Sequence, residues 1–309
     1  MMKYVIMGSG GTGASIGGFL ANAGHDVTLI ARGNHLKAIR QHGLILHSDK
    51  LGEITLKNIK AMTTDEYISS GEKADVIFVA VKGYSINEII PFLQKASDTH
   101  TIIIPILNIY GTGRYLAEKL PQTNVLEGCI YIVAYISAPG EITQSGDIFR
   151  IVYGTRGPSP LKAQLLQIKQ DLENSGIKVV LSENIADDTF RKFTFVSPFA
   201  AAAAYYDINA GAIQQKGKEQ DLFIALTKDC MAIAEAYNIK LPDDIMDINL
   251  KIMYAVTPDT TASMQKDLAR GHQSEMDGLI FEIVRMARQK NITVPAYEKV
   301  ASHFGFKIN

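Results

Sequence analysis

KYVIMGSGGTG, residues 3–13, places a short run of apolar and β-branched side chains directly before a cluster of glycines. The spacing fits G-x-G-x-x-G, the turn between the first strand and first helix of a dinucleotide-binding βαβ unit. Gly8 permits the tight turn, Gly10 lets the backbone approach a pyrophosphate, and Gly13 allows the helix and strand to pack closely. Glycine-rich turns are common, but the preceding strand, the following helix and a second strand ending near residue 31 favour a dinucleotide site. The predicted loop comprises Gly8, Ser9, Gly10, Gly11, Thr12 and Gly13.

The end of the second strand bears on the choice of cofactor. An NAD site usually carries an Asp or Glu there, which holds the ribose 2′-hydroxyl. DVTLIA (26–31) is followed by Arg32 instead, with no acid at the strand end. A planar guanidinium can pair with a 2′-phosphate, although an arginine at a strand end can also simply be solvated. The sequence therefore favours NADP(H) as the cofactor.

Short apolar runs alternate with helical stretches through the first half of the chain. Residues 74–81 and 101–107 read as buried strands, residues 129–154 as strand–turn–strand, and residues 178–182 as a last strand. Continuous apolar runs separated by helices indicate a parallel sheet with crossover connections.

Strand-like runs disappear after about residue 184, and residues 224–237 and 276–289 read as amphipathic helices. We therefore predict an α/β protein with an N-terminal Rossmann-type doubly wound sheet followed by an all-helical C-terminal domain. The predicted domains are an NADP-binding domain at residues 1–183 and a helical substrate domain at residues 184–309.

Composition excludes several classes of function. With 309 residues, 47% of them hydrophobic, the chain can form two domains with full cores. A formal charge of −1 gives no electrostatic basis for binding nucleic acid or an anionic membrane. Cys129 and Cys230 match no metal spacing, the seven histidines form no ligand cluster, and no apolar segment approaches the roughly 18 residues of a membrane helix. We expect a cytoplasmic protein without a metal, acting on a small molecule.

Several segments together resemble the ketopantoate reductase (2-dehydropantoate 2-reductase) family, and the similarity runs through nearly the whole chain. They are GSGGTG (8–13), ARGNHLKAIRQHGL (31–44), Val81-Lys82, PGEITQSGD (139–147), FRKF (190–193), NAG (209–211) and SMQKDLARGHQSEMD (263–277). The resemblance implies a Rossmann domain and a helical domain with the site in the cleft between them. It also implies NADPH-dependent reduction of ketopantoate to (R)-pantoate, on the route to pantothenate and coenzyme A. Family members are often dimers, which allows a homodimer here.

Lys192 falls on the catalytic lysine of the family. A positioned ammonium can polarise the C2 carbonyl oxygen and protonate it, an assistance typically worth about 10²–10⁴-fold. The flanking Phe190, Phe193 and Phe195 would desolvate the ammonium and lower its pKa towards working pH. Without the resemblance, Lys192 reads as a helix-surface lysine paired with Asp188 four residues earlier.

Asn108 falls on the family asparagine beside the nicotinamide and the lysine. The usual Asn-Gly pair is interrupted, because Ile109 and Tyr110 precede Gly111. A turn asparagine is the alternative interpretation. Lys82 matches a family lysine on the cofactor side, just past the carboxyl end of a strand, where doubly wound sheets bind ligands. An exposed loop lysine is the alternative there.

Two residues of the second half match family positions that contact the substrate. Ser263 matches a serine that hydrogen-bonds the substrate carboxylate, and Glu275 an acid that touches the substrate or cofactor region. Glu275 also has a structural interpretation, because Ser274 and Asp277 resemble a helix start, where acids are ordinary.

The sequence departs from the family on the helix of Lys192. The family carries asparagines four and eight residues after the lysine, on one helical stripe. An ungapped count places Val196 and Ala200 there as substrate-contacting residues. A three-residue deletion that aligns Pro198 with a family proline would instead place Ser197 at one asparagine. Losing a hydrogen bond to a substrate hydroxyl costs roughly 1–3 kcal/mol, so the reaction is better supported than the substrate.

A further departure is Ile280-Phe281, where the family often has Asn-Gly, and we expect altered packing or a reshaped pocket there. Three hypotheses follow. The first is an NADPH-dependent ketopantoate reductase, and the second is a reductase of the same family for a more apolar 2-oxo acid. The third is a non-catalytic NADP(H)-binding redox sensor, which would have no use for Lys192, Asn108, Ser263 and Glu275 together.

Overall fold

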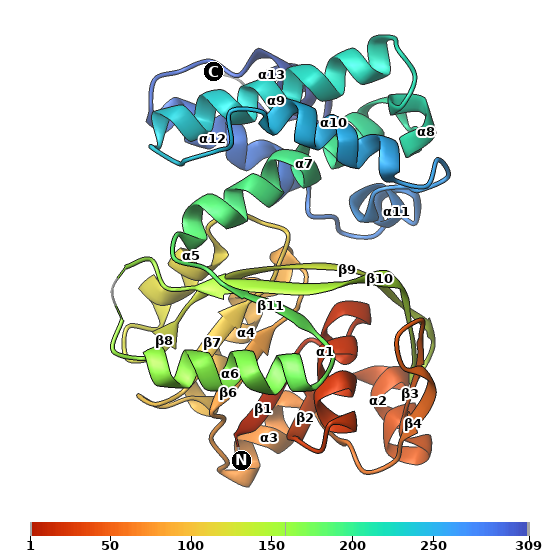
Figure 1. Ribbon diagram of the computed structural model, residues 1–309, viewed down its shortest axis with the longest axis vertical. Coiled ribbons are helices and arrows are strands. Elements are labelled where there is room, and N and C mark those ends of the chain that lie inside the picture. Colours follow the sequence, from red (N-terminus) through yellow and green to blue (C-terminus); the bar gives the residue numbers. More distant parts are fainter. Residues whose placement is uncertain (1, 158, 308–309) are drawn as a thin grey trace. The chain divides into compact units, whose positions relative to one another are not determined.

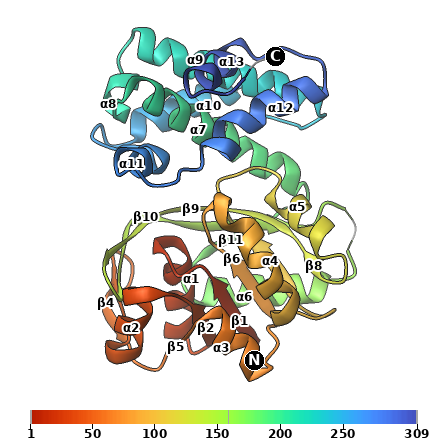
Figure 2. The ribbon, with the colours of Figure 1, turned by 180° about the vertical axis from the view of Figure 1, so that it is seen from behind.

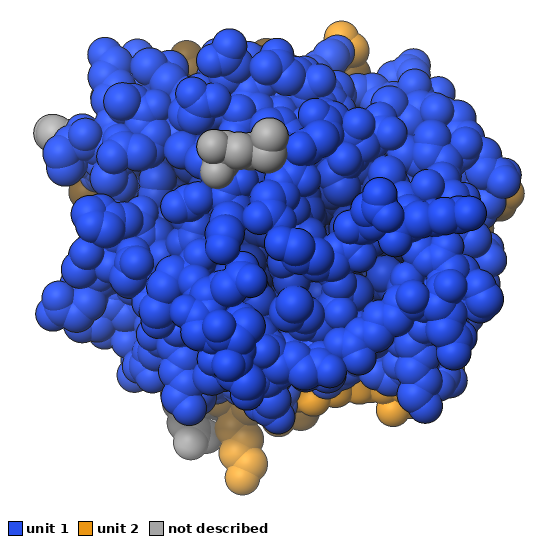
Figure 3. Space-filling view, turned by 90° about the horizontal axis from the view of Figure 1, so that it is seen from below, with its two compact units in different colours: residues 1–107, 111–185 blue, residues 108–110, 186–309 orange. Residues whose placement is uncertain are grey.

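The computed structural model describes residues 2–157 and 159–307. Contacts divide the chain into two compact units, shown in different colours in Figure 3. Unit 1 comprises residues 1–107 and 111–185, and unit 2 comprises residues 108–110 and 186–309. The division after Ile185 lies two residues beyond the predicted boundary at 183. The segment Asn108–Tyr110 belongs by its contacts to unit 2, although its sequence neighbours belong to unit 1.

A parallel sheet forms the first layer of unit 1 (Figure 1). Within the described residues its strand order is β5-β2-β1-β6-β7-β8, and every neighbouring pair is parallel. The strands are β1 (Lys3–Met7), β2 (Asp26–Ile30), β5 (Lys60–Met62), β6 (Val76–Val79), β7 (Ile102–Pro105) and β8 (Asn124–Val125). The intervening helices are α1 (Gly11–Asn22), α2 (Gly33–His42), α3 (Thr64–Ser70), η1 (Gly83–Ser85), α4 (Ile86–Ala96) and α5 (Thr112–Lys119). The predicted parallel sheet with crossovers is confirmed.

A second sheet in unit 1 was only partly predicted. Its strand order is β11-β10-β3-β4, and β9 pairs antiparallel with β10. The strands are β3 (Leu44–Ser48), β4 (Gly52–Leu56), β9 (Glu127–Ala138), β10 (Glu141–Gly154) and β11 (Lys178–Leu181), with α6 (Lys162–Asn174) between the last two. The apolar residues of 129–154 and 178–182 indicated β9, β10 and β11, whereas β3 and β4 are short and partly polar and were not predicted.

Helix α1 packs against both sheets, and β9 and β10 run across it in Figures 1 and 2. Gly17 faces the parallel sheet, where a Cβ would lie 2.5 Å from Leu29 Cδ2. Gly18 faces the second sheet, where a Cβ would lie 3.3 Å from Leu44 Cδ2. Phe19, on the same helix, meets Phe149 of β10 edge to face at 4.8 Å between ring centroids. The two small residues thus let one helix serve two layers.

Unit 2 is helical, as predicted. Its elements are α7 (Ile185–Tyr206), α8 (Ala210–Ile213), α9 (Lys218–Ala236), α10 (Ile245–Ala255), α11 (Ser263–Ala269), the π-helical turn η2 (Asp277–Phe281), α12 (Glu282–Gln289) and α13 (Pro295–His303). The alanines at 200–203 of α7 are buried in the core, where small side chains allow helices to approach closely. Among the described residues, no helix has the length and apolar character that a membrane crossing requires.

Helix α7 contains Pro198 in its interior. Proline has no N–H, so the carbonyl of Thr194, four residues earlier, loses its helical donor. Asn249 of α10 replaces that donor: its Nδ2 lies 3.0 Å from Thr194 O and 3.0 Å from Thr194 Oγ1. Thr194 and Asn249 are both buried, so water cannot serve in place of the amide. The bond therefore joins α10 to α7 at the turn of the helix that contains Pro198.

We expect Asn249→Ala to lower the free energy of unfolding by about 1–3 kcal/mol, because it leaves a buried carbonyl without a donor. The measurement is urea denaturation followed by circular dichroism. In a Pro198→Ala background the amide N–H at position 198 can bond to Thr194 O, so the same substitution should cost less. An equal cost in both backgrounds would show that Asn249 does not compensate for the proline.

Candidate functional site

The predicted dinucleotide loop lies between the end of β1 and the start of α1. Helix α1 begins at Gly11, and its N-cap residue, Gly10, makes no side-chain capping bond. The first N–H groups of a helix have no acceptor within the helix, so they can bind an anion, and the helix dipole favours negative charge there. Ser9 holds the loop to the end of β2, since its Oγ donates to Ile30 O at 2.8 Å.

The glycines of the loop meet different surroundings. Gly8 has a φ of +101°, and a Cβ on it would lie 2.9 Å from backbone atoms of Ala80 and Val81. A Cβ on Gly13 would lie 2.0 Å from Gly8 O, so only glycine fits there. A Cβ on Gly10, by contrast, would meet no atom within 4 Å. Open space beside Gly10, with tight packing at Gly8 and Gly13, fits a loop whose backbone is approached by a pyrophosphate.

The two cationic residues predicted on the cofactor side lie at strand ends in unit 1. Arg32 is exposed and is the N-cap residue of α2, directly after β2 and Ala31. Lys82 is half-buried and is the N-cap residue of η1, shortly after β6. Both positions belong to the carboxyl edge of the parallel sheet, the edge at which doubly wound folds bind ligands.

His35 is a residue of this region that the sequence did not single out. Its Nδ1 accepts a hydrogen bond from Gly140 N at 2.9 Å, which ties α2 to the turn between β9 and β10. Burial lowers the pKa of His35 from its ordinary value, and the neutral ring can accept at Nδ1. The bond brings together two motifs that carried the family resemblance, ARGNHL and PGEI. The presence of both motifs in the sequence was the signal from which a contact between them could have been predicted.

Lys192 and Asn108 are in direct contact within unit 2. Lys192 Nζ donates to Asn108 Oδ1 at 2.7 Å, a length typical of a charge-assisted hydrogen bond. Lys192 lies about two turns into α7 and is half-buried, and Asn108 is half-buried in the segment after β7. Asp188, the alternative partner considered for the lysine, forms an ion pair with Arg191 at 2.9 Å. The structure thus brings together the two residues that the family resemblance placed side by side.

Aromatic residues lie close to Lys192 and Asn108 in the sequence and contact one another. Phe190 and Phe193 are buried on either side of Lys192 in the sequence. Tyr110, two residues after Asn108, meets Phe190 edge to face at 4.8 Å and lies 6.3 Å from the ring of Phe193. Phe190, Phe193 and Tyr110 thus form an aromatic group that contains the sequence neighbours of both Lys192 and Asn108, and the effect of these rings on the ammonium stays a prediction.

Ser263 and Glu275 occupy different environments. Ser263 is exposed and is the first residue of α11. Glu275 is only 5% exposed, although a carboxylate is seldom fully buried without partners. Its carbonyl accepts from Leu279 N at 2.9 Å, so the residue leads directly into the π-helical turn η2. π-Helical turns are rare in proteins, and those that occur are often found at functional sites.

The stripe of α7 that follows Lys192 is apolar. Val196 is half-buried one turn later, and Ala200 is buried in the helical core. Ser197, which the gapped alignment would place at a family asparagine, is fully buried. Its Oγ donates to Leu279 O at 2.5 Å and also bonds to the hydroxyl of Tyr297. The Ser197 hydroxyl is thus engaged within the helical core.

Ile280-Phe281, the other departure from the family pattern, makes apolar packing contacts. Ile280 is fully buried in the helical core. Phe281 lies against Phe306, with 4.8 Å between the ring centroids. These side chains therefore contribute apolar contacts where an Asn-Gly pair could not.

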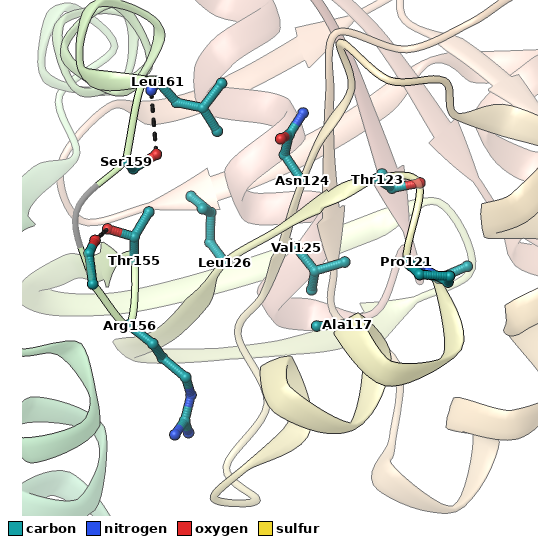
Figure 4. A pocket seen from close by; sticks show the side chains of 12 residues that line it. Ala117, Pro121, Thr123, Asn124, Val125, Leu126, Thr155, Arg156, Ser159 and Leu161 are labelled. Atoms are coloured by element: carbon teal, nitrogen blue, oxygen red, sulfur yellow. Dashed lines mark hydrogen bonds between the residues drawn. The ribbon is translucent and has the colours of Figure 1, made fainter.

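A cavity of about 360 Å³ lies in unit 1 and is lined by residues from α5, β8 and the loop after β10. Figure 4 shows the side chains that line it. The Arg156 side chain extends away from the labelled Ser159 and Leu161, and its guanidinium pairs with Glu127 at 2.5 Å. None of the predicted site residues is among the described residues that line this cavity. Nor do residues 2–157 and 159–307 contain a group of three His, Cys, Asp or Glu side chains that could hold a metal.

Comparison of the chain with known proteins identifies its family. The description "Ketopantoate reductase PanE/ApbA" matches residues 4–157, and "Ketopantoate reductase PanE/ApbA C terminal" matches residues 184–307. The chain belongs to the ketopantoate reductase family. It is therefore an oxidoreductase that acts on a CH–OH group, in a family of NAD(P)H-dependent enzymes.

Relatives of the ketopantoate reductase family match over nearly their whole length. The 2-dehydropantoate 2-reductase of Pyrococcus horikoshii is 26% identical over 95% of this chain and 93% of that protein. The uncharacterized oxidoreductase YkpB of Bacillus subtilis is 24% identical over 97% and 96%. Among solved structures, the PanE/ApbA family ketopantoate reductase of Ralstonia eutropha is 26% identical, with a TM-score of 0.87 over 98% and 97% of the two chains. A D-mandelate dehydrogenase is 20% identical, with a TM-score of 0.88 over 97% and 96%, and shares the fold.

The surroundings of the loop glycines predict opposite effects of alanine at two positions. Gly13→Ala should lower the melting temperature, because its Cβ would overlap Gly8 O. Gly10→Ala should leave the melting temperature of the free protein unchanged but weaken dinucleotide binding by at least about tenfold, since the methyl group occupies the approach to the backbone. Thermal denaturation and isothermal titration with NADPH and NADH measure the two effects. Unchanged affinity in Gly10→Ala would place the pyrophosphate elsewhere.

Proposed function

We propose that the protein is an NADPH-dependent 2-dehydropantoate 2-reductase. It reduces the C2 carbonyl of ketopantoate to the hydroxyl of (R)-pantoate, in the biosynthesis of pantothenate and coenzyme A. The observation that carries the proposal is the 2.7 Å hydrogen bond between Lys192 Nζ and Asn108 Oδ1, two residues at the family's catalytic positions. An ammonium held in place by a hydrogen bond to the Asn108 amide can be presented to a carbonyl oxygen in a fixed orientation.

The dinucleotide, when bound, supplies the hydride that reduces the carbonyl carbon. Residues Gly8 to Gly13 hold its pyrophosphate through the amides at the start of α1. Arg32 is exposed at the end of β2 and binds the 2′-phosphate, which favours NADPH over NADH. Lys82, at the same edge of the sheet, adds a positive charge on the cofactor side.

Lys192 is the general acid. Reduction of the C2 carbonyl places negative charge on its oxygen, and the ammonium of Lys192 stabilises that charge and donates one proton to form the hydroxyl. Asn108 accepts one of the three ammonium hydrogens, which orients the remaining two. Ser263 donates to the substrate carboxylate, and Glu275 contacts the substrate from the segment before η2.

A second candidate is reduction of a more apolar 2-oxo acid by the same chemistry. It is favoured by Val196, which presents an aliphatic side chain one helical turn after Lys192, where the family has an asparagine. Ala200 adds no hydrogen-bonding group on the same stripe. The D-mandelate dehydrogenase of similar fold was solved with NADH and anilino(oxo)acetate, a 2-oxo acid with an aromatic group. Substrates of that kind therefore belong in any test.

The proposal predicts that the purified protein oxidises NADPH in the presence of ketopantoate, and does so faster than NADH. A spectrophotometric assay at 340 nm with ketopantoate and a panel of aliphatic and aromatic 2-oxo acids distinguishes the two candidates by kcat/KM. Lys192→Ala should lower kcat by about 10²–10⁴-fold, the usual contribution of a general acid. The exposed lysine of α10, Lys251, provides a matched control, and Lys251→Ala should retain full activity.

Two outcomes would overturn the proposal. Tight NADPH binding without turnover of any 2-oxo acid would leave a dinucleotide sensor. Full activity in Lys192→Ala would refute the assigned acid, whatever the substrate.

A further inference from the structure

Three consecutive residues, Asn108, Ile109 and Tyr110, connect β7 of unit 1 to α5 of unit 1 yet belong to unit 2. Each has its own partner among the helices. Asn108 accepts from Lys192, and Tyr110 packs on Phe190. Ile109, between them, occupies the position at which the family has the glycine of an Asn-Gly pair.

Ile109 fills the space beside Gly278, a residue of the π-helical turn η2. A Cβ built on Gly278 would lie 2.5, 2.7 and 2.9 Å from three carbon atoms of the Ile109 side chain. Carbon atoms pack at about 3.5–4.0 Å, so no side chain larger than hydrogen fits at 278 while Ile109 keeps its position. The isoleucine at position 109 and the glycine at position 278 are therefore complementary, because the Ile109 side chain occupies the space where a side chain of residue 278 would lie.

We propose that Ile109 and Gly278 interlock to hold Asn108 on Lys192, and are thus positioning residues for the general acid. The inference rests on the proposed role of Lys192. Ile109 is covalently adjacent to Asn108, so a displacement of its backbone is passed directly to the amide that accepts from the ammonium. A hydrogen bond of 2.7 Å is lost when its atoms separate by about 1 Å, and misplacement on that scale can cost about 100-fold in rate.

The same contact also reaches the segment of Glu275. Gly278 lies three residues after Glu275, and Leu279 N donates to Glu275 O within the same turn. The contact between Ile109 and Gly278 therefore links the turn that begins at Glu275 to the segment that carries Asn108. Ile109 thus serves a purpose that the glycine of the usual family pair could not.

The test compares Gly278→Ala, Ile109→Ala and the double variant. Gly278→Ala should lower kcat by about 10- to 100-fold with little change in the KM for NADPH, because the added methyl displaces the Asn108 segment and leaves the dinucleotide loop intact. Ile109→Ala alone should lower kcat less, since it removes bulk without creating a clash. The double variant should recover most of the kcat lost in Gly278→Ala. Gly157→Ala and Ile252→Ala are matched controls at positions with open space and surface exposure.

A second readout does not depend on turnover. Competitive trace acetylation followed by mass spectrometry measures the reactivity of the Lys192 amine in each variant. It should rise in Gly278→Ala and return towards the wild-type value in the double variant. If the wild type reduces no 2-oxo acid but this pattern is observed, the proposed function fails and the interlock stands.

Other results would overturn the interlock itself. These are wild-type kcat and Lys192 reactivity in Gly278→Ala, or a double variant no better than Gly278→Ala. Should Gly278→Ala fail to fold, the double variant must fold, because it relieves the clash. Failure of the double variant as well would show that Ile109 is not what Gly278 accommodates.

Discussion

The hydrogen bond between Lys192 and Asn108 imposes a constraint on the path of the chain. Lys192 lies on the long helix α7, whereas Asn108 follows a strand of the parallel sheet, so the β7–α5 connection must deliver its first residues to the helical unit. Asn108 cannot do this alone, because one hydrogen bond to a charged group is worth only about 1.5–3 kcal/mol net. Ile109 and Tyr110 supply the apolar contacts that fix the segment.

The connection is also fixed on its return to unit 1. Glu127 of β9 accepts from Arg114 N at 3.1 Å, in the first turn of α5, and its carboxylate is held in turn by Arg156. A Cβ on Gly113 would lie 2.3 Å from Glu127 Cγ, so the helix begins in close contact with this buried acid. Negative charge at a helix N-terminus is stabilising. The segment that carries Asn108 therefore runs between a sheet strand and a capped helix, which restricts its freedom.

Much of the fold could be predicted from the sequence, because it is encoded in local patterns. The apolar run before Gly8 predicts the first strand, and the later apolar runs predict the parallel sheet. The loss of strand patterns after residue 184 predicts the helical domain. Strands β3 and β4 were not predicted, because each has only five residues and apolar and polar side chains are mixed within it. The place of β3 in a sheet depends on pairing with β10, which lies about a hundred residues later in the sequence, and β4 pairs with β3 in turn.

The site was less accessible from the residues alone. Nothing local distinguishes Lys192 from a surface lysine, and only the family resemblance placed it beside Asn108. The interruption of the Asn-Gly pair by Ile109 was visible in the sequence, but its complement at Gly278 was not, because the two residues meet only after folding. The donor that Asn249 supplies to Thr194 was hidden for the same reason, although Pro198 signalled that some donor would be needed.

Chemical rescue of Lys192→Ala tests most directly whether the ammonium of Lys192 donates the proton. With NADPH and the preferred 2-oxo acid at saturation, added methylammonium can enter the space left by the lysine side chain and act as the acid. If Lys192 is the general acid, the rate rises with methylammonium and not with tetramethylammonium, which has the same charge but no proton to donate. Equal rescue by both cations, or by neither, would contradict the assignment of Lys192 as the general acid.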